Sequence, residues 1–84
     1  MTPDRFVLGG EVYLTLDSVA SLYRVETDLL AAICDLGLLE SVERVEDSLA
    51  LAAAELDRLA EILRLHVHFG VDLESVALLL EGAA

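Results

Sequence analysis

The chain has no lysine, asparagine, glutamine or tryptophan, and its basic side chains are five arginines and two histidines. Sixteen aspartates and glutamates oppose them, which gives a formal net charge of −11 and an isoelectric point near 4.2. Because phosphate contacts supply most non-specific affinity for nucleic acid, such a chain is repelled by DNA, and by anionic membranes too. Its electrostatic complement is a basic protein surface.

Other absences in the sequence exclude further classes of protein. The single cysteine, Cys34, cannot form an internal disulfide, which favours a reducing compartment. No apolar run approaches the roughly 20 residues of a spanning helix, and the first residues do not resemble a signal peptide. The sequence also has no glycine-rich phosphate loop and no recognisable nucleophile, base and acid set. We therefore expect a cytoplasmic protein that is not an enzyme, with no catalytic or cofactor-binding residues.

Two histidines raise the question of a metal site. His66 and His68 are two residues apart, so on a helix their side chains point in nearly opposite directions and cannot share one ion. Cys34 falls on a different predicted helix, where it packs as a small hydrophobic residue. We expect no metal site. The histidines are more simply explained by their place near a helix C-terminus, where imidazolium is favourable.

The first half of the chain has clear signals for local structure. Gly9-Gly10 between two apolar runs predicts a short hairpin over 6–8 and 11–14. Thr15 then predicts the N-cap of a helix over 16–23, and a second helix follows over 27–36. Gly37 ends that helix, because the residue that closes its last turn needs a positive φ.

The second half predicts an extended, wing-like segment or an irregular loop over 40–50, followed by a long helix over 52–69. Gly70 ends this helix, and Asp72 caps a short last helix. The long helix carries two apolar stripes on nearly opposite sides. They are Leu56, Leu59, Ala60, Leu63 and Val67 on one side, and Ile62, Leu65 and Phe69 on the other.

These stripes bear on the state of association. With 84 residues and 56% hydrophobic side chains, residues 1–84 form one small, very apolar domain. The last helix must cover the second stripe, or another chain must do so. We expect a homodimer or a partner-bound chain rather than an isolated monomer.

The two helices around the turn at Val25 have the spacing of a helix-turn-helix. The second helix of a DNA reader carries basic or amide side chains toward base edges and phosphates. Here Glu26, Asp28 and Asp35 are its only charged residues. The spacing thus predicts a mainly α, winged helix-turn-helix domain of about four helices with a short hairpin, while the charges argue against its usual ligand.

Three short segments and one long one show a family resemblance. Tyr13-Leu-Thr-Leu, Val25-Glu26-Thr27 and Leu36-Gly37-Leu38-Leu39 match the MerR pattern of strand, turn and helix end. Residues 63–79, LRLHVHFGVDLESVALL, are similar to the CbpM segment in which an Arg-Leu helix ends before a capped apolar helix. Over roughly 11–81 the chain therefore resembles MerR-type proteins, and among them the CbpM chaperone modulators. The Thermus-type assembly factor of DnaK and DnaJ is a similar case.

The chain also departs from the DNA-binding members of that group. Asp28, Ala31 and Ala32 stand where MerR regulators carry Arg, Arg and Tyr, and Ser48-Leu49-Ala50 replaces the Gly-Tyr-Arg of the wing. These differences weaken the interpretation as a DNA-binding regulator and leave the modulator interpretation intact.

The resemblance implies binding to the J-domain of a DnaJ- or CbpA-type co-chaperone, which presents a basic helix to Hsp70. A compact acidic protein on that helix would compete with Hsp70 or hold the co-chaperone in an assembly. The candidate interface is the acidic face of the second helix and the following loop: Glu26, Asp28, Asp35, Glu40, Glu43 and Glu46, with Asp47 beside them. Alternatives are a solvated face, a MerR- or excisionase-like DNA-binding regulator, and an anti-repressor that mimics nucleic-acid charge.

Overall fold

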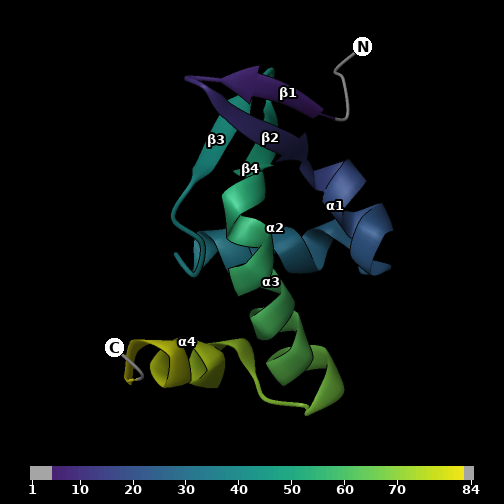
Figure 1. Ribbon diagram of the computed structural model, residues 1–84. Coiled ribbons are helices and arrows are strands. Elements are labelled where there is room, and N and C mark those ends of the chain that lie inside the picture. Colours follow the sequence, from purple (N-terminus) through teal and green to yellow (C-terminus); the bar gives the residue numbers. More distant parts are fainter. Residues whose placement is uncertain (1–4, 83–84) are drawn as a thin grey trace.

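The computed structural model describes residues 5–82 as a sheet with helices packed beneath it (Figure 1). A 3-10 turn (η1) and a π-helical turn (η2) flank the third α-helix. The elements in chain order are β1 (Arg5–Leu8), β2 (Glu11–Thr15), α1 (Leu16–Tyr23), α2 (Thr27–Asp35), β3 (Val42–Val45), β4 (Ser48–Ala52), η1 (Ala53–Glu55), α3 (Leu56–Leu63), η2 (Arg64–His68) and α4 (Leu73–Gly82).

The prediction of a mainly α, winged helix-turn-helix domain is wrong in its fold class. Four strands form one antiparallel sheet in the order β1-β2-β4-β3, and strands make up 23% of the structure, so the domain is α+β. The predicted first hairpin does form. The segment 40–50 forms a second hairpin, and β4 extends through Ala52, where Tyr13 is its partner. An isolated hairpin is marginal in water, so pairing of the two hairpins stabilises both.

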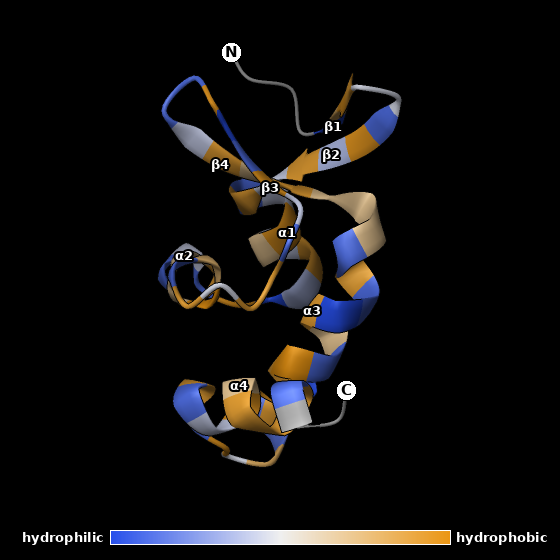
Figure 2. Cartoon of the chain, turned by 90° about the vertical axis from the view of Figure 1, so that its left-hand side faces the viewer, coloured by the Kyte–Doolittle hydropathy of each residue, from blue (hydrophilic) through white to orange (hydrophobic). Residues whose placement is uncertain are grey.

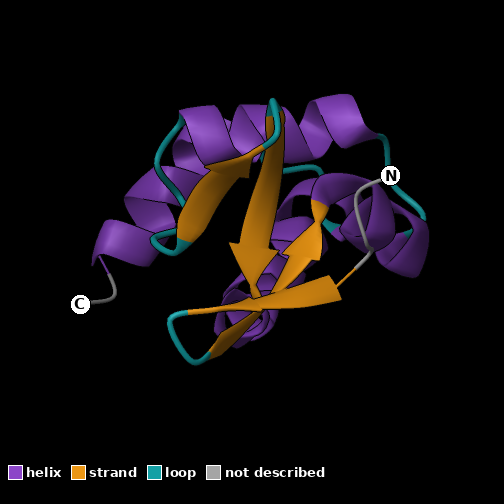
Figure 3. Ribbon diagram, turned by 90° about the horizontal axis from the view of Figure 1, so that it is seen from above, coloured by secondary structure: helices purple, strands orange, loops and turns teal. Residues whose placement is uncertain are grey.

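The two hairpins diverge from their shared β2–β4 pair, and the helices gather on one side (Figures 2 and 3). Because side chains alternate along a strand, each strand has a face toward the helices and a face away from them. Leu14, Leu51 and Val42 belong to the main core with the helices. Tyr13 packs on the other face in a small second cluster with Ala50, Ala52 and Phe6.

The predicted helices at 16–23 and 27–36 are confirmed to within one residue. The hydroxyl of Thr15 caps α1 by accepting a hydrogen bond from the N–H of Ser18 at 3.2 Å. Beyond α2, Gly37 has a φ of 74°, and the N–H of Leu38 donates to the carbonyl of Ile33 at 3.3 Å. This is the glycine-dependent ending that the sequence predicts.

Removing the Thr15 cap is expected to lower the free energy of unfolding by about 1 kcal/mol. Thr15→Ala leaves the N–H of Ser18 without its side-chain acceptor, whereas Thr15→Ser keeps the hydroxyl and serves as the control. Urea unfolding followed by circular dichroism measures both. Equal midpoints for the alanine and serine variants would show that the cap contributes nothing.

The predicted long helix over 52–69 is interrupted. Ala52 ends a strand, the α-helix proper is α3, and η2 continues it with a π-helical turn in which the N–H of Phe69 donates to the carbonyl of Arg64 at 3.2 Å. A π turn changes the rotation per residue, so a helical pattern counted from 52 loses its phase. Val67, predicted on the first apolar stripe, is therefore 58% exposed. The predicted end at Gly70 is confirmed by its φ of 70°.

The main core lies where the sheet meets the helices. Its fully buried large side chains come from α1, α2, β4, α3 and α4, so each of these elements contributes to a single core. These side chains are Val19, Leu30, Ile33, Leu51, Leu59, Ile62 and Val76.

The last helix covers only part of the second predicted stripe. Ile62 is fully buried and Leu65 is partly buried, but Phe69 is 65% exposed beside the exposed Val67. The homodimer or partner-bound state stays a prediction, and the exposed apolar side chains Val67 and Phe69 at the end of η2 are its basis. Sedimentation equilibrium is expected to show self-association at micromolar concentration, weakened by Phe69→Ser. A single monomeric species over that range would contradict it.

Asp72 caps α4 as the sequence predicts. Its Oδ1 accepts a hydrogen bond from the N–H of Ser75 at 2.8 Å. Hydrogen bonds from Ser75, the backbone N–H first, lower the pKa of Asp72; burial opposes them, and the nearby His66 adds a weaker lowering effect. The ionised carboxylate is thus the form that the folded state stabilises.

This shift predicts a pH dependence of stability. Because the pKa of Asp72 is lower in the folded state, its contribution is complete above the unfolded-state value of about 3.9 and disappears as the pH falls through the folded-state value. Asp72→Asn keeps a capping side chain but cannot titrate. The difference in unfolding free energy between the native chain and this variant should shrink in acid below about pH 4. A constant difference would show that the cap is not ionic.

Candidate partner-binding groove

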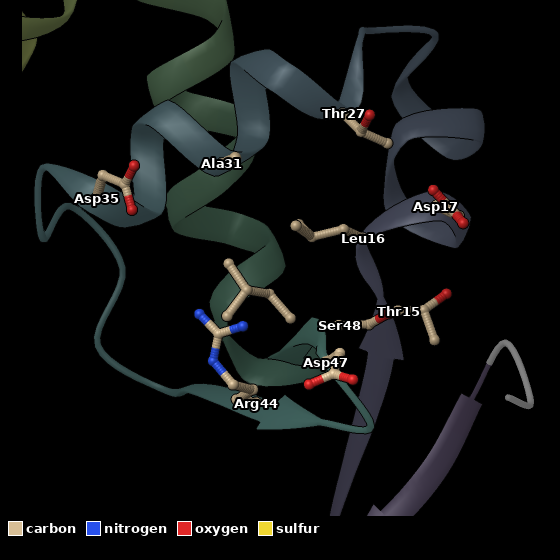
Figure 4. A pocket seen from close by; sticks show the side chains of 10 residues that line it. Thr15, Leu16, Asp17, Thr27, Ala31, Asp35, Arg44, Asp47 and Ser48 are labelled. Atoms are coloured by element: carbon tan, nitrogen blue, oxygen red, sulfur yellow. The ribbon is translucent and has the colours of Figure 1, made fainter.

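A groove of about 650 Å³ lies between α2 and the β3–β4 hairpin, with the start of α1 at one end (Figure 4). We call it the α2 groove. Its lining comes from three separate parts of the chain, which the pairing of β4 with β2 brings together. The lining residues are Thr15, Leu16, Asp17, Thr27, Ala31, Asp35, Arg44, Asp47, Ser48 and Leu49.

The helix and the hairpin position these side chains in different ways. Thr27, Ala31 and Asp35 follow one another at four-residue intervals, so they lie along one face of α2. On the opposite wall, the turn between β3 and β4 has positive φ at both Glu46 (49°) and Asp47 (65°). Two such residues are what a tight two-residue hairpin turn requires, and the turn brings Asp47 to the groove.

The groove is acidic around an apolar floor. Asp17, Asp35 and Asp47 are exposed carboxylates on three different elements, and Arg44 is its single cation. Arg44 makes no ion pair within residues 5–82. Half-buried Leu16 and Leu49 provide apolar surface between the charges. This arrangement suits a basic amphipathic segment.

The structure places the six predicted interface acids on the surface but does not gather them. All of them are exposed, and only Asp35 lines the α2 groove. Glu26 and Asp28 lie at the start of α2 outside the lining. Glu43 is on the other face of β3, Glu46 is in the hairpin turn, and the N–H of Glu40 donates to the carboxylate of Glu55 at 2.7 Å.

Two charged residues of the groove were missing from the predicted interface. Asp17 lies in the first turn of α1, directly after the Thr15 cap. Its place at the start of this helix could be predicted from the sequence. Arg44 reaches the groove because it alternates with Glu43 along β3. That signal depends on knowing that the segment is a strand, which the sequence left open.

Cys34 and His66 take part in packing and helix termination. Cys34 is half-buried against the main core, as predicted for a small hydrophobic residue. Burial first and the nearby charge of Asp35 second raise the pKa of its thiol, which disfavours the reactive thiolate. The Nδ1–H of His66 donates to the carbonyl of Val71 at 2.7 Å. Within residues 5–82, no three side chains of His, Cys, Asp and Glu gather as metal ligands do.

No family model matches the chain, and no curated protein or solved structure matches it. None of the helices described has the length and apolar character that crossing a membrane requires.

Proposed function

We propose that this chain is a non-enzymatic, cytoplasmic adaptor that binds the J-domain of a DnaJ- or CbpA-type co-chaperone and controls its engagement of Hsp70. The observation that carries the proposal is the α2 groove, where three carboxylates surround an apolar floor. The resemblance of residues 63–79 to the CbpM modulators is the reason for choosing the J-domain among basic partners.

The groove accounts for how a basic helix would be held. One side of the helix would pack on Leu16, Ala31 and Leu49, and its Arg and Lys side chains would reach the carboxylates on either wall. Charges at such a rim mainly raise the association rate and select the partner, while the apolar floor slows dissociation. Covering the basic helix of the J-domain would keep Hsp70 from it.

The acids outside the groove have a supporting role in this mechanism. Glu26, Asp28 and Glu40 are exposed near α2 and add to the negative potential around it. Such a potential attracts a basic partner from a distance without forming fixed contacts, and salt screens it over about 10 Å at 0.1 M.

Calorimetry with a purified J-domain tests the proposal. We expect saturable binding at about 0.05 M salt and clearly weaker binding at about 0.5 M salt, because ionic contacts at the rim are screened. Adding the chain should also lower the stimulation of Hsp70 ATP hydrolysis by the same co-chaperone. No binding at low salt would reject the proposal.

A gel-shift assay at low salt separates this proposal from the DNA-binding alternative. The acidic groove should give no retardation of duplex DNA, because phosphates and carboxylates repel each other. Retardation that disappears as salt rises would favour the regulator and overturn the adaptor.

A further inference from the structure

A second cavity lies between the two hairpins, on the sheet face opposite Arg44 and the α2 groove. Its volume is about 310 Å³, and we call it the hairpin notch. The two hairpins diverge from the β2–β4 pair (Figure 2). The residues that line it are Leu8, Gly9, Glu11, Tyr13 and Glu43.

Strand register explains why these side chains share one space. Tyr13 pairs with Ala52 and Glu43 pairs with Ala50, so all four lie on the same face of the sheet. The two alanines stand on β4 between the tyrosine and the glutamate, and their small side chains leave the space above them open. Phe6 stacks on the ring of Tyr13, with centroids 6.0 Å apart and planes 14° apart, and fixes that side of the notch.

The hydroxyl of Tyr13 has no hydrogen-bond partner within residues 5–82, although the side chain is only 8% exposed. Among the described residues no buried side-chain oxygen lacks a partner, so this hydroxyl is open to solvent and available to a ligand. It lines the notch together with two exposed carboxylates, and neither Glu11 nor Glu43 is paired with an arginine in the described part of the chain. Burial, then Glu43, then Glu11 raise the pKa of Tyr13, in keeping with the place of both carboxylates in the same notch.

We propose that the hairpin notch binds the guanidinium group of an arginine side chain presented by a partner protein. A guanidinium offers five N–H donors in one plane, enough to reach the Tyr13 hydroxyl and both carboxylates. Its alkyl stem would pack on Leu8. A lysine ammonium is compact and more strongly hydrated than a guanidinium. It is therefore less suited to a notch that offers three acceptors beside an aromatic ring. The notch is a site separate from the α2 groove, and its occupant need not be a J-domain.

Small ligands test the notch without a partner protein. The ¹⁵N-labelled full chain is titrated with N-acetyl-arginine amide, its lysine counterpart and its neutral isostere N-acetyl-citrulline amide, followed by NMR. We expect the arginine ligand to shift the amides of Leu8, Gly9 and Glu11, with much smaller shifts for citrulline and lysine. Glu43→Gln should weaken arginine binding about two- to fivefold, the range of one exposed ion pair.

Further variants separate the hydroxyl from the charge. Tyr13→Phe removes only the hydroxyl and should also weaken the arginine ligand, whereas Glu81→Gln on α4 removes a distant exposed charge and should change nothing. Equal shifts with citrulline or lysine, undiminished affinity in Glu43→Gln, or shifts centred elsewhere would overturn the proposal. Because no J-domain enters this experiment, failure of the notch and failure of the adaptor function are distinguishable.

Discussion

Replacing Ile62 by alanine is expected to lower the free energy of unfolding by about 3 kcal/mol, within the range of roughly 2–5 kcal/mol for such truncations. Ile62 is fully buried in the main core, where it belongs to the same cluster as Leu30, Leu59 and Val76. A domain of this length has a total stability of roughly 4–13 kcal/mol. The variant would therefore lose a large fraction of this stability, because the surrounding helices close only partly around the cavity that the smaller side chain leaves.

Val67→Ala is the matched comparison, because Val67 lies farther along the same helical segment but is 58% exposed. Its expected cost is within about 0.5 kcal/mol. Urea unfolding measures both variants. An equal loss of stability in Val67→Ala and Ile62→Ala would show that Val67 is buried. That result would favour an uninterrupted helix over 52–69 and contradict the π turn at η2.

Changing two carboxylates of the α2 groove is expected to weaken J-domain binding about 30-fold. The variant Asp35→Lys, Asp47→Asn places a positive charge on one wall of the groove and removes a negative charge from the other. A basic helix would then meet one repulsive and one neutral contact in place of two attractive ones. Calorimetry at low salt measures the loss.

Both substitutions suit the backbone at their positions. Asp35 ends α2, where a lysine interacts favourably with the helix dipole. Asp47 has a φ of 65°, which asparagine accepts readily. The control, Glu74→Gln with Glu81→Lys, changes the net charge equally on α4, which lines no part of the groove. If the groove variant and the control weakened J-domain binding equally, the loss would come from net charge and not from the groove.

The parts of the fold that depend on neighbouring residues could be predicted from the sequence. Thr15, Gly37, Gly70 and Asp72 each start or end a helix by forming hydrogen bonds or turns with residues a few positions away. Such signals are complete within a short window of sequence. For this reason both ends of α1 and α2, and the start of α4, match the predictions closely.

The parts that depend on distant residues could not be predicted. Ala52 looks helical by propensity, yet it is a strand residue because Tyr13 pairs with it across the sheet. The π turn at η2 changes the phase of the apolar stripe without any proline or glycine to announce it. Asp17 and Asp47 likewise line the same groove only because the two hairpins pair. The lining therefore could not be predicted from acids that are close in sequence.

NMR mapping of a J-domain on the ¹⁵N-labelled chain tests the central claim, that the α2 groove holds a basic helix, most directly. Addition of the J-domain at low salt should shift the amides of Ala31, Asp35, Ser48 and Leu49 together, and leave those of α4 nearly unchanged. High salt should reverse the shifts, because the rim contacts are ionic. Shifts centred on the exposed apolar end at Val67 and Phe69, or no shifts at all, would contradict the account.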